Sequence, residues 1–427
     1  MKICIMGTRL GCIEGESIEA DSWYDLLSHL GYELHMLAGT FCTKREVKCK
    51  ESPLLDHKHP EIRAVKRILF GSPLDKAGKK TAKILLDNTV TRLKGDVKKF
   101  FQHEKFDLII VINIFSDLKN PVASVVMREL AKELSVPMIS YERTFVWDND
   151  YYTKHNNFPN LTDEIPPTLK HITHVVNTTQ KAKELQEHKN ITPKVIPKFL
   201  NLEKLQQEDA QTRRFRTVFE IPDDAYIFLQ PTRLSRKKGV EHALKIVAGV
   251  NKATKKENVL ILTGPPRYFR GSYFEEIVKR MQKMKVRVIF AHDKIGLSRE
   301  SSMFSMGDAY LNCDMVLFPA TQHAFGRPVL EAFAYKKPIV VVKQSYYDDL
   351  KQFDPQMIEI EKVDEQVISD VMETLLLDEK REEMVKKNFA ILKEHYSQEA
   401  VSENIITLLN ELERKPFFTR MKKRFIG

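Results

Sequence analysis

The chain has 427 residues, more than one hydrophobic core usually holds, so about two domains are expected. Hydrophobic residues make up 42% of it and charged residues 30%, as in soluble globular proteins, and no apolar run approaches the ~20 residues of a membrane span. The net charge of +10 (68 basic minus 58 acidic residues) permits anionic partners such as nucleotides, phosphorylated substrates or an anionic membrane face. Zinc-finger spacings and aromatic RNA-binding patterns are missing from the sequence, so no nucleic-acid partner is expected.

The N-terminus and the cysteines indicate the compartment. The N-terminal sequence MKICIMGTRLG fits a first strand better than a secretory signal, because its apolar run is short and carries only one lysine before it. The five cysteines are scattered, odd in number and without a CxxC pair. We interpret them as buried or free thiols in a reducing compartment, not as a disulfide frame or a zinc site. A cytoplasmic protein is therefore expected.

Strands and helices alternate along the first half of the chain. A strand at Lys2–Met6, a helix at Ile18–Leu30 and a strand at Glu33–Ala38 make a first βαβ unit. Residues 44–80 are polar, basic and broken by prolines, which indicates loops or short helices. The elements expected after them are a basic helix at 79–103, a strand at 106–115, a helix at 121–134, strands at 136–141 and 172–177, a helix at 179–188 and a strand at 195–199.

A second alternating series follows a polar segment at 200–224, in which we place the domain boundary. Its expected strands are 226–231, 258–263, 286–291, 315–318, 339–342 and 357–360, and its expected helices are 240–250, 273–284, 301–309 and 329–335. Helices at 365–377, 379–396 and 400–412 close the chain. Two consecutive series of this kind predict an α/β fold with two doubly wound, Rossmann-like domains.

The most informative stretch is CDMVLFPATQHAFGRPVLEAFAYKKPIVVV, from Cys313 to Val342. It predicts a buried strand, a loop broken by Gly326 and Pro328, a helix carrying Glu331 in its first turn, and a second buried strand. In open α/β sheets, ligands bind where such a loop leaves the carboxyl end of a strand. The unpaired N–H groups and the positive pole of a helix N-terminus favour a phosphate there.

A basic turn follows the first strand of the second series, PTRLSRKKG at 231–239. Arg233 and Lys238 can both reach the carboxyl edge of the sheet, where an Arg fork and a Lys point charge suit a diphosphate. The alternative is a solvated basic turn. The helix start near Glu331 favours a phosphate site over that alternative. A carboxylate beside a phosphate site can accept hydrogen bonds from ribose hydroxyls, so Glu331 is the candidate for that role.

These segments resemble the donor domain of family-4 retaining glycosyltransferases of the GT-B fold, the glycosyl transferases group 1. The motifs are PTRLSRKKG, LTG at 262–264, VIFAHDKI at 288–295 and HAFGRPVLEAFAYKKPIVV at 323–341; VIPKFLNL at 195–202 is similar to the segment that leads to that domain. The family pattern places two glutamates eight positions apart around an FGxP core. Glu331 is the second of them, and His323 stands at the position of the first.

The resemblance implies a GT-B enzyme with two domains facing across a cleft. Residues 1–203 would form the acceptor domain, 204–385 the nucleotide-sugar donor domain, and 386–427 helices that return to the first domain. It implies a metal-independent hexosyltransferase that uses a UDP- or GDP-sugar as co-substrate and a sugar or glycan hydroxyl as acceptor, with no cofactor. The implied catalytic residues are Arg233, Lys238, Glu331 and His323, and the implied donor-binding residues are Phe325, Gly326, Arg327, Pro328, Val329, Leu330, Gly264 and His292. His292 could equally be a loop histidine whose ring nitrogens are hydrogen-bonded within the protein.

The acceptor side is less readable. The candidates are Gly11 and Glu16 in the first loop, Tyr141 and Glu142 at a strand end, and Trp147 in the aromatic loop that follows. Trp147 could stack on a sugar, or it could be an ordinary packing residue. The sequence Asp148–Asn149–Asp150 matches a DxD metal motif, but a surface turn is the better interpretation because no donor-domain strand precedes it.

Two alternatives stay open at this stage. The departure at His323 allows a catalytically inactive, glycosyltransferase-like protein that binds a nucleotide sugar or a glycan. A phosphorylase or an epimerase of the same fold is disfavoured by the family-4 arrangement. The basic tail at 414–427, with apolar residues on one helical face, suits either a peripheral contact with the inner face of an anionic membrane or packing against the first domain.

Overall fold

The chain forms two compact α/β units. The computed structural model describes residues 1–43, 45–154, 156–264, 272–296, 298–300, 302–321 and 326–414. Unit 1 holds Met1–Lys198 and the part of the last helix that begins at Val401, and unit 2 holds Phe199–Ala400. The predicted boundary after residue 203 therefore lies five residues beyond the division at Lys198, and residues 386–400 belong to unit 2.

Unit 1 is built on a parallel sheet of seven strands in the order β3-β2-β1-β4-β5-β6-β7. Strands β4 and β5 at its centre are fully buried, and β1 is buried except at Lys2, as expected for a parallel sheet covered on both faces. The strands are β1 (Lys2–Met6), β2 (Glu33–Ala38), β3 (Lys48–Glu51), β4 (Leu108–Ile112), β5 (Met138–Glu142), β6 (Ile172–Val176) and β7 (Lys194–Val195). Because the order reverses between β1 and β4, the carboxyl ends of these two strands mark the switch point at which such sheets bind ligands.

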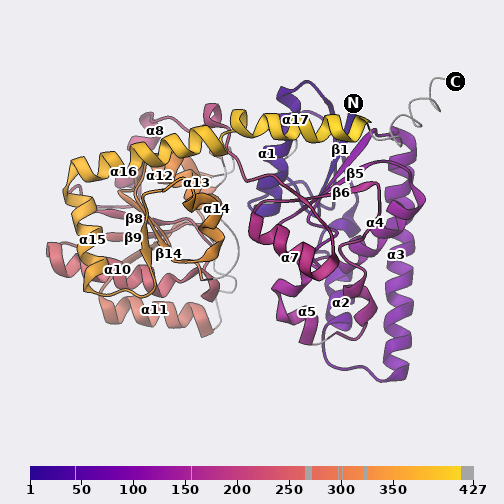
Figure 1. Ribbon diagram of the computed structural model, residues 1–427. Helices are drawn as coiled ribbons and strands as arrows, with labels where there is room; N and C mark the ends of the chain where they lie inside the picture. The colour runs from indigo at the N-terminus through magenta and orange to yellow at the C-terminus, as the bar shows by residue number, and fades with distance from the viewer. Residues whose placement is uncertain are drawn as a thin grey trace. The chain divides into compact units, whose positions relative to one another are not determined.

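Helices cover this sheet (Figure 1). Apolar side chains of α2, α3 and α4 join β4 in one large core. The helices of unit 1 are α1 (Gly15–His29), α2 (Pro60–Leu69), α3 (Lys76–Glu104), α4 (Pro121–Glu133), α5 (Asp150–Lys154), α6 (Pro159–Asp163) and α7 (Thr179–Lys189), with 3-10 turns at Pro53–Leu55 and Val146–Asp148. The last helix, α17 (Gln398–Arg414), starts in unit 2 and continues into unit 1, where Lys194 and Glu411 form an ion pair of 2.8 Å.

Unit 2 repeats the plan with a parallel sheet of six strands in the order β10-β9-β8-β13-β14-β15. The strands are β8 (Ile227–Gln230), β9 (Val259–Leu262), β10 (Arg287–Phe290), β13 (Met315–Phe318), β14 (Ile339–Val342) and β15 (Ile358–Ile360), and β11 (Ile295–Gly296) pairs separately with β12 (Phe304–Ser305). The switch point lies between β8 and β13, which pair with Val316 opposite Leu229. The helix-start loop singled out from the sequence therefore leaves a strand of the switch point.

The two faces of this sheet have separate cores. One lies under α10 (Val240–Thr254), α11 (Ser272–Met284) and α15 (Glu365–Leu376), and the other under α12 (Met306–Asn312), α13 (Arg327–Ala334) and the end of α16 (Asp378–Ile391). Figure 1 shows α10 and α11 on one side of the sheet and α12 and α13 on the other. The remaining turns are α8 (Ala210–Arg213), α9 (Phe215–Val218), α14 (Asp348–Lys351), 3-10 turns at Leu202–Lys204, Arg236–Lys238 and Ser345–Tyr347, and a π-helical turn at Leu392–Tyr396.

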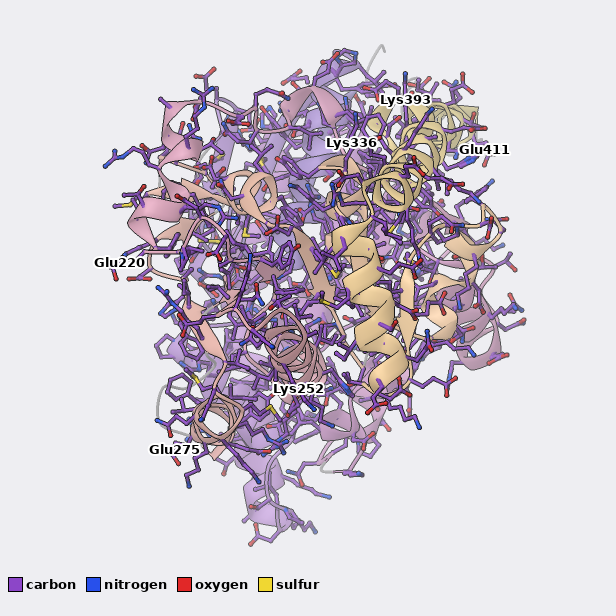
Figure 2. The ribbon with its side chains drawn as sticks, turned by 90° about the vertical axis from the view of Figure 1, so that its left-hand side faces the viewer. Glu220, Lys252, Glu275, Lys336, Lys393 and Glu411 are labelled. Atoms are coloured by element: carbon purple, nitrogen blue, oxygen red, sulfur yellow. A yellow bond between two sulfur atoms is a disulfide. The ribbon has the colours of Figure 1, made fainter. Side chains whose placement is uncertain are left out.

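The surface of unit 2 is charged, with Glu220 and Glu275 among the exposed side chains (Figure 2). No helix in the described ranges is both long and apolar enough to cross a membrane. The basic tail lies outside the described residues from 415 onward, so its two interpretations stay open.

The doubly wound α/β fold is confirmed, and the differences from the predicted elements are local. Strand β3 lies inside the segment expected to hold only loops and short helices, because its sequence KCKE lacks the apolar run by which strands are recognised. The α12 helix begins at Met306, not at residue 301, because Ser305 caps it and Phe304 pairs in β12. The α13 helix begins two residues early, at Arg327, which moves Glu331 from the first turn to the second.

Candidate active site

Two loops meet at the switch point of unit 2. Gly239, between the basic turn and α10, has a φ of +62°, and a Cβ there would lie 2.0 Å from the carbonyl oxygen of Pro319. Thr321 donates its backbone N–H to the carbonyl of Lys237 at 3.0 Å. The buried amide of Gln230, the last residue of β8, donates to the carbonyl of Lys238 at 2.8 Å. The basic turn after β8 is thus fixed against the loop after β13.

The two predicted phosphate-binding cations lie on this fixed turn. The Lys238 ammonium is 5.6 Å from the centre of the Phe318 ring, at the end of β13. Arg233 is exposed, and its guanidinium has no hydrogen bond or ion pair with any described residue. Gly264, after β9, lies so close to the Arg233 backbone that a Cβ would come within 2.6 Å of it. The predicted residues Arg233, Lys238 and Gly264 therefore lie at the ends of neighbouring strands.

The start of α13 adds backbone donors to this edge. Gly326 lies against the same Phe318 ring, and no side chain of the described residues caps the helix N-terminus. Not all of the predicted N–H groups can bind a ligand, because Pro328 has none and Val329 already donates to the carbonyl of Gly326 at 3.0 Å. Among the described residues no acceptor is shown for the N–H groups of Gly326, Arg327 and Leu330, so these three remain as candidates.

Glu331 is positioned from two sides. One carboxylate oxygen accepts from the Arg327 Nε at 2.8 Å, and the other accepts from the Tyr310 hydroxyl at 2.7 Å. Burial, and then the neighbouring Glu331, raise the pKa of Tyr310 well above its usual value, so this hydroxyl stays a donor. The Glu331 side chain is 20% exposed. A carboxylate has about four acceptor positions, so two can still receive a ligand's hydroxyls.

The other predicted residues of unit 2 are less informative. His292 lies in the turn after β10, half-buried, at the outer end of the same sheet edge. His323 and Phe325 lie outside the described residues, so their roles stay predictions.

Unit 1 carries a cluster of charged residues at its own switch point. Glu16, in the first turn of α1, accepts from the Asn113 amide at 3.1 Å and from the Lys119 ammonium, both of which follow β4. Burial alone would raise the pKa of Glu16, but Lys119 and Arg143 hold it below its usual range. Glu16 therefore remains ionised and keeps Lys119 at the N-terminus of α1.

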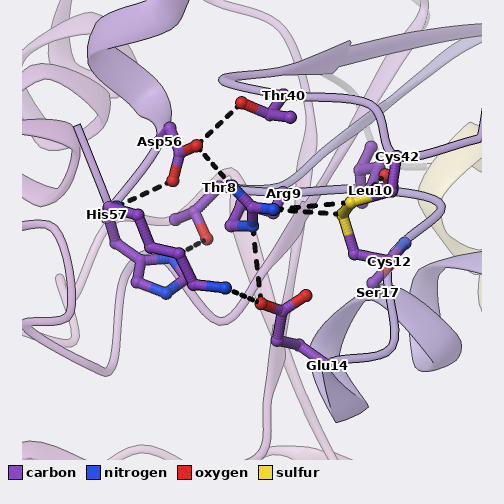
Figure 3. Close-up of a disulfide and its surroundings, with 11 residues drawn as sticks. Thr8, Arg9, Leu10, Cys12, Glu14, Ser17, Thr40, Cys42, Asp56 and His57 are labelled. Atoms are coloured by element: carbon purple, nitrogen blue, oxygen red, sulfur yellow. Dashed lines mark hydrogen bonds and ion pairs between the residues drawn. A yellow bond between two sulfur atoms is a disulfide. The ribbon is translucent and has the colours of Figure 1, made fainter. Parts of the chain in front are cut away.

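A disulfide between Cys12 and Cys42 ties the loop after β1 to the loop after β2 (Figure 3). The interpretation of all five cysteines as free thiols is wrong for these two; spacing could not reveal the pair, because 30 residues separate them. Beside it, Arg9 forms ion pairs with Asp56 at 2.5 Å and with Glu14 at 3.4 Å. Gly11 turns the same loop and packs closely on the Thr43 backbone, and its acceptor role stays a prediction.

Two predicted acceptor residues on β5 are buried in the fold. Tyr141 is 1% exposed and donates its hydroxyl to Glu19 at 2.8 Å. Glu142 is fully buried and accepts from the Ser140 hydroxyl and the His174 ring, both within 2.8 Å. Both side chains are thus buried and paired inside unit 1, and their contact with the acceptor stays a prediction.

The aromatic loop does not form a sugar-stacking wall. The Trp147 indole is stacked between Phe145 and His188, at ring distances of 4.4 and 4.3 Å, so neither of its faces is open. In the neighbouring DxD match, Asp148 pairs with the buried Lys181 and Asp150 with Lys154. Both aspartates thus have structural partners, as the surface-turn interpretation predicts.

Comparison with known proteins indicates the class of enzyme. Residues 211–391 match the family model of the glycosyl transferases group 1. This region is a glycosyl transferases group 1 domain. The mannosylglucosylglycerate synthase of Thermotoga maritima is 24% identical over 94% of this chain and 98% of its own length. Together these matches identify the chain as a glycosyltransferase and confirm the resemblance predicted from its motifs.

The solved structures similar to this glycosyltransferase have the GT-B fold. Sucrose-phosphate synthase from Thermosynechococcus elongatus superposes with a TM-score of 0.69 at 14% identity, covering 96% of this chain and 99% of that one. Anabaena Alr3699/HepE, solved in complex with UDP and glucose, gives a TM-score of 0.63 at 14% identity, with 96% and 99% covered. At these identities the likeness establishes the fold.

Some positioning residues of this glycosyltransferase were missed from its sequence. Tyr310, which holds Glu331, lies in a helix that packs against α13, and no strand-end rule points to it. Asp56 and His57 were missed because β3, the strand before them, was not recognised. Arg143 directly follows β5 and Lys119 lies in the loop after β4, so the strand-end rule could have found them.

Proposed function

We propose that this glycosyltransferase moves a hexose from a nucleoside-diphosphate sugar to an acceptor hydroxyl, with retention of the anomeric configuration and without a metal ion. The observation that carries the proposal is the convergence of Arg233, Lys238, the start of α13 and Glu331 at the carboxyl edge of β8 and β13.

The electrostatics of the reaction support these roles. Cleavage of the donor's glycosidic bond leaves negative charge on the departing diphosphate. Fixed cations and N–H dipoles at that charge are usually the largest catalytic contribution, and removing one such donor costs about 10²–10³ in kcat. Arg233, Lys238 and the N–H groups of Gly326 and Arg327 can supply that stabilisation, which is the role a divalent metal would otherwise take.

Glu331 would bind the ribose. Its carboxylate is already oriented by Arg327 and Tyr310, so little side-chain freedom is lost when a ligand binds. Two ribose hydroxyls can donate to the two positions that remain. In this proposal no carboxylate acts as nucleophile; the acceptor hydroxyl attacks from the side that the diphosphate leaves, and a diphosphate oxygen takes its proton.

The relatives suggest which substrates to try first. The similar synthase is named for making mannosylglucosylglycerate, and a related fold was solved with UDP and glucose. Mannosyl and glucosyl donors on both UDP and GDP are therefore the first to test, with glucosylglycerate among the acceptors.

A donor screen tests the proposal. Release of UDP or GDP is measured for each nucleotide sugar, with and without acceptor and with EDTA present, and the anomeric configuration of the product is read by NMR. Acceptor-dependent release that persists in EDTA, with a retained anomer, is the expected result. Tight binding of a nucleotide sugar with no turnover for any acceptor would favour the inactive, binding-only alternative raised by His323.

A further inference from the structure

A single buried amide joins both ends of the basic turn that carries Arg233 and Lys238. Gln230, the last residue of β8, is fully buried at the switch point of unit 2. Its amide nitrogen donates to the Thr232 hydroxyl at 3.2 Å and to the Lys238 carbonyl at 2.8 Å. Because Thr232 directly precedes Arg233, one of these hydrogen bonds holds the start of the turn and the other holds its end.

The main chain at the start of the turn is fixed as well. The Thr232 N–H donates to the backbone carbonyl of Gln230 at 2.8 Å, so the turn begins directly at the strand end. A Cβ on Gly264, after β9, would lie 2.7 Å from the Thr232 carbonyl carbon and 2.6 Å from the Arg233 nitrogen. The Arg233 side chain therefore leaves from a backbone position that β8 and the loop after β9 determine together.

Core packing does not explain a glutamine at this position. The other residues of β8, 227–229, are apolar and fully buried, as in a parallel strand covered on both faces. The amide oxygen of Gln230 is buried and has no hydrogen-bond partner in the part of the chain that the structure describes. An unpaired buried acceptor costs free energy, which an apolar side chain would avoid. Such departures from core packing concentrate at functional sites, and what this glutamine gains is the pair of donated hydrogen bonds.

The spacing of two cations matters most for a ligand with two phosphates. Arg and Lys side chains are long, so an unfixed turn would lose conformational entropy when the ligand binds. A turn held at both ends removes part of that cost and keeps both cations at the charge that develops on the leaving group. A nucleoside monophosphate lacks the second phosphate, so it gains less from a correctly spaced pair.

We propose that Gln230 is a positioning residue for the donor diphosphate. Its amide sets the spacing of Arg233 and Lys238, and the site therefore prefers nucleoside diphosphates over monophosphates. Gln230 acts through the turn and not through contact with the sugar. This inference rests on the proposed function, which places the diphosphate at these two cations.

Calorimetry on the full chain tests this role with UDP, UMP, GDP and GMP. The measured quantity is the ratio of diphosphate to monophosphate affinity for the base that binds. Gln230→Met keeps the length of the side chain and removes both donors, and we expect it to lower the ratio about tenfold while monophosphate affinity stays within about twofold. Thr232→Val removes only the acceptor at the start of the turn and should lower the ratio about threefold.

The matched control is Asn388→Leu. Asn388, on α16, is another fully buried amide of unit 2, and it donates to the backbone carbonyl of Gln356 at 2.7 Å. The loss of this amide should lower the unfolding free energy of unit 2 and leave the affinity ratio unchanged. The control thus separates a loss of stability from a loss of diphosphate preference.

Turnover of the donor that the screen selects gives a second measurement. Gln230→Met should lower kcat in the wild-type background and add little to the loss in Lys238→Ala, because both changes act on the same phosphate contact. A full additional loss in the Lys238→Ala background would show that Gln230 does not act through this lysine, and would overturn the proposal.

The binding data can overturn the proposal in three further ways. The wild type could show no preference for the diphosphate, Gln230→Met could keep the wild-type ratio, or it could weaken both nucleotides equally. Should Gln230→Met bind neither nucleotide, an unchanged ratio in Thr232→Val overturns the proposal in its place. If the ratio falls as expected and no donor gives sugar transfer, the proposed function is overturned and the role of Gln230 at the diphosphate site stands.

Discussion

Gly239 and Pro319 are in direct contact across the switch point of unit 2, where the Pro319 carbonyl oxygen fills the space that a Cβ of Gly239 would need. This contact joins the basic turn after β8 to the loop after β13. The donor site depends on it, because Lys238 precedes Gly239 directly and Gly326 follows the loop that Pro319 begins.

Gly239→Ala should therefore disturb both stability and donor binding. Alanine is strained at a φ of +62° and would collide with the carbonyl, so we expect a loss of about 1–3 kcal/mol in the unfolding free energy of unit 2 and weaker UDP or GDP binding. The control is Gly95→Ala, in the exposed part of α3, where a Cβ meets nothing within 4 Å. That change should stabilise by about 0.5–1 kcal/mol. Equal nucleotide affinity in Gly239→Ala and the wild type would show that the two loops do not depend on this contact.

The Cys12–Cys42 disulfide should stabilise unit 1. A disulfide typically contributes about 2–4 kcal/mol, so the double variant Cys12→Ser/Cys42→Ser should lower the unfolding free energy of unit 1 by about that amount. The measurement is denaturant unfolding followed by tryptophan fluorescence, because both tryptophans, Trp23 and Trp147, lie in unit 1. Cys49→Ser, at a free thiol, should change the midpoint little. An unchanged midpoint in the double variant would contradict the expected contribution.

His57 should make the stability of unit 1 depend on pH in the acid range. Burial and then the Lys119 ammonium lower the pKa of His57 to about 4, against the opposing influence of Glu16, Asp56 and Glu14. The usual value is about 6.5, so between about pH 6.5 and pH 4 the unfolded chain binds the extra proton. The contribution of His57 to the unfolding free energy should therefore fall as the pH drops through this window and stay constant above it.

The comparison of His57→Gln with the wild type isolates this effect, because the contributions of the carboxylates cancel in the difference. The variant should lose part of the slope between pH 6.5 and 4, whereas His29→Gln, at an exposed histidine, should keep it. An NMR titration that finds His57 protonated at pH 6 would show that the assumed direction of the pKa shift is wrong.

Trp147 should matter for folding and not for acceptor binding. Its indole is stacked on both faces and donates to Glu184 at 3.3 Å. Trp147→Phe should keep the KM for the acceptor within about twofold and lower the thermal midpoint of unit 1, because the hydrogen bond and part of the stacked area are lost. A tenfold rise in the acceptor KM with an unchanged thermal midpoint would restore the stacking role expected from the sequence.

The fold class could be predicted from local patterns of apolar residues in the sequence. Buried strands such as β4 and β13 are apolar runs between helices, and their alternation specifies a doubly wound sheet. The donor site was also predictable from the sequence, since Arg233, Lys238 and Glu331 lie in the loop and helix start that follow β8 and β13 along the chain. The charged cluster of unit 1 was not, because it joins residues from four loops up to about 130 positions apart. The polar residues of β5, such as Tyr141 and Glu142, could not be assigned from the sequence. The apolar pattern of a parallel strand does not tell which of its polar side chains are paired inside the protein.

The most direct test of the account is the kcat/KM of Lys238→Ala and Glu331→Ala for the nucleotide sugar that the donor screen selects. The control is Lys252→Ala, on α10, a lysine remote from the switch point in sequence and labelled in Figure 2. We predict that Lys238→Ala loses about 100-fold or more, that Glu331→Ala loses about tenfold or more through a weaker donor KM, and that Lys252→Ala is unchanged. If Lys238→Ala and Glu331→Ala both kept the wild-type kcat/KM while folded, the donor site would not lie between β8 and β13.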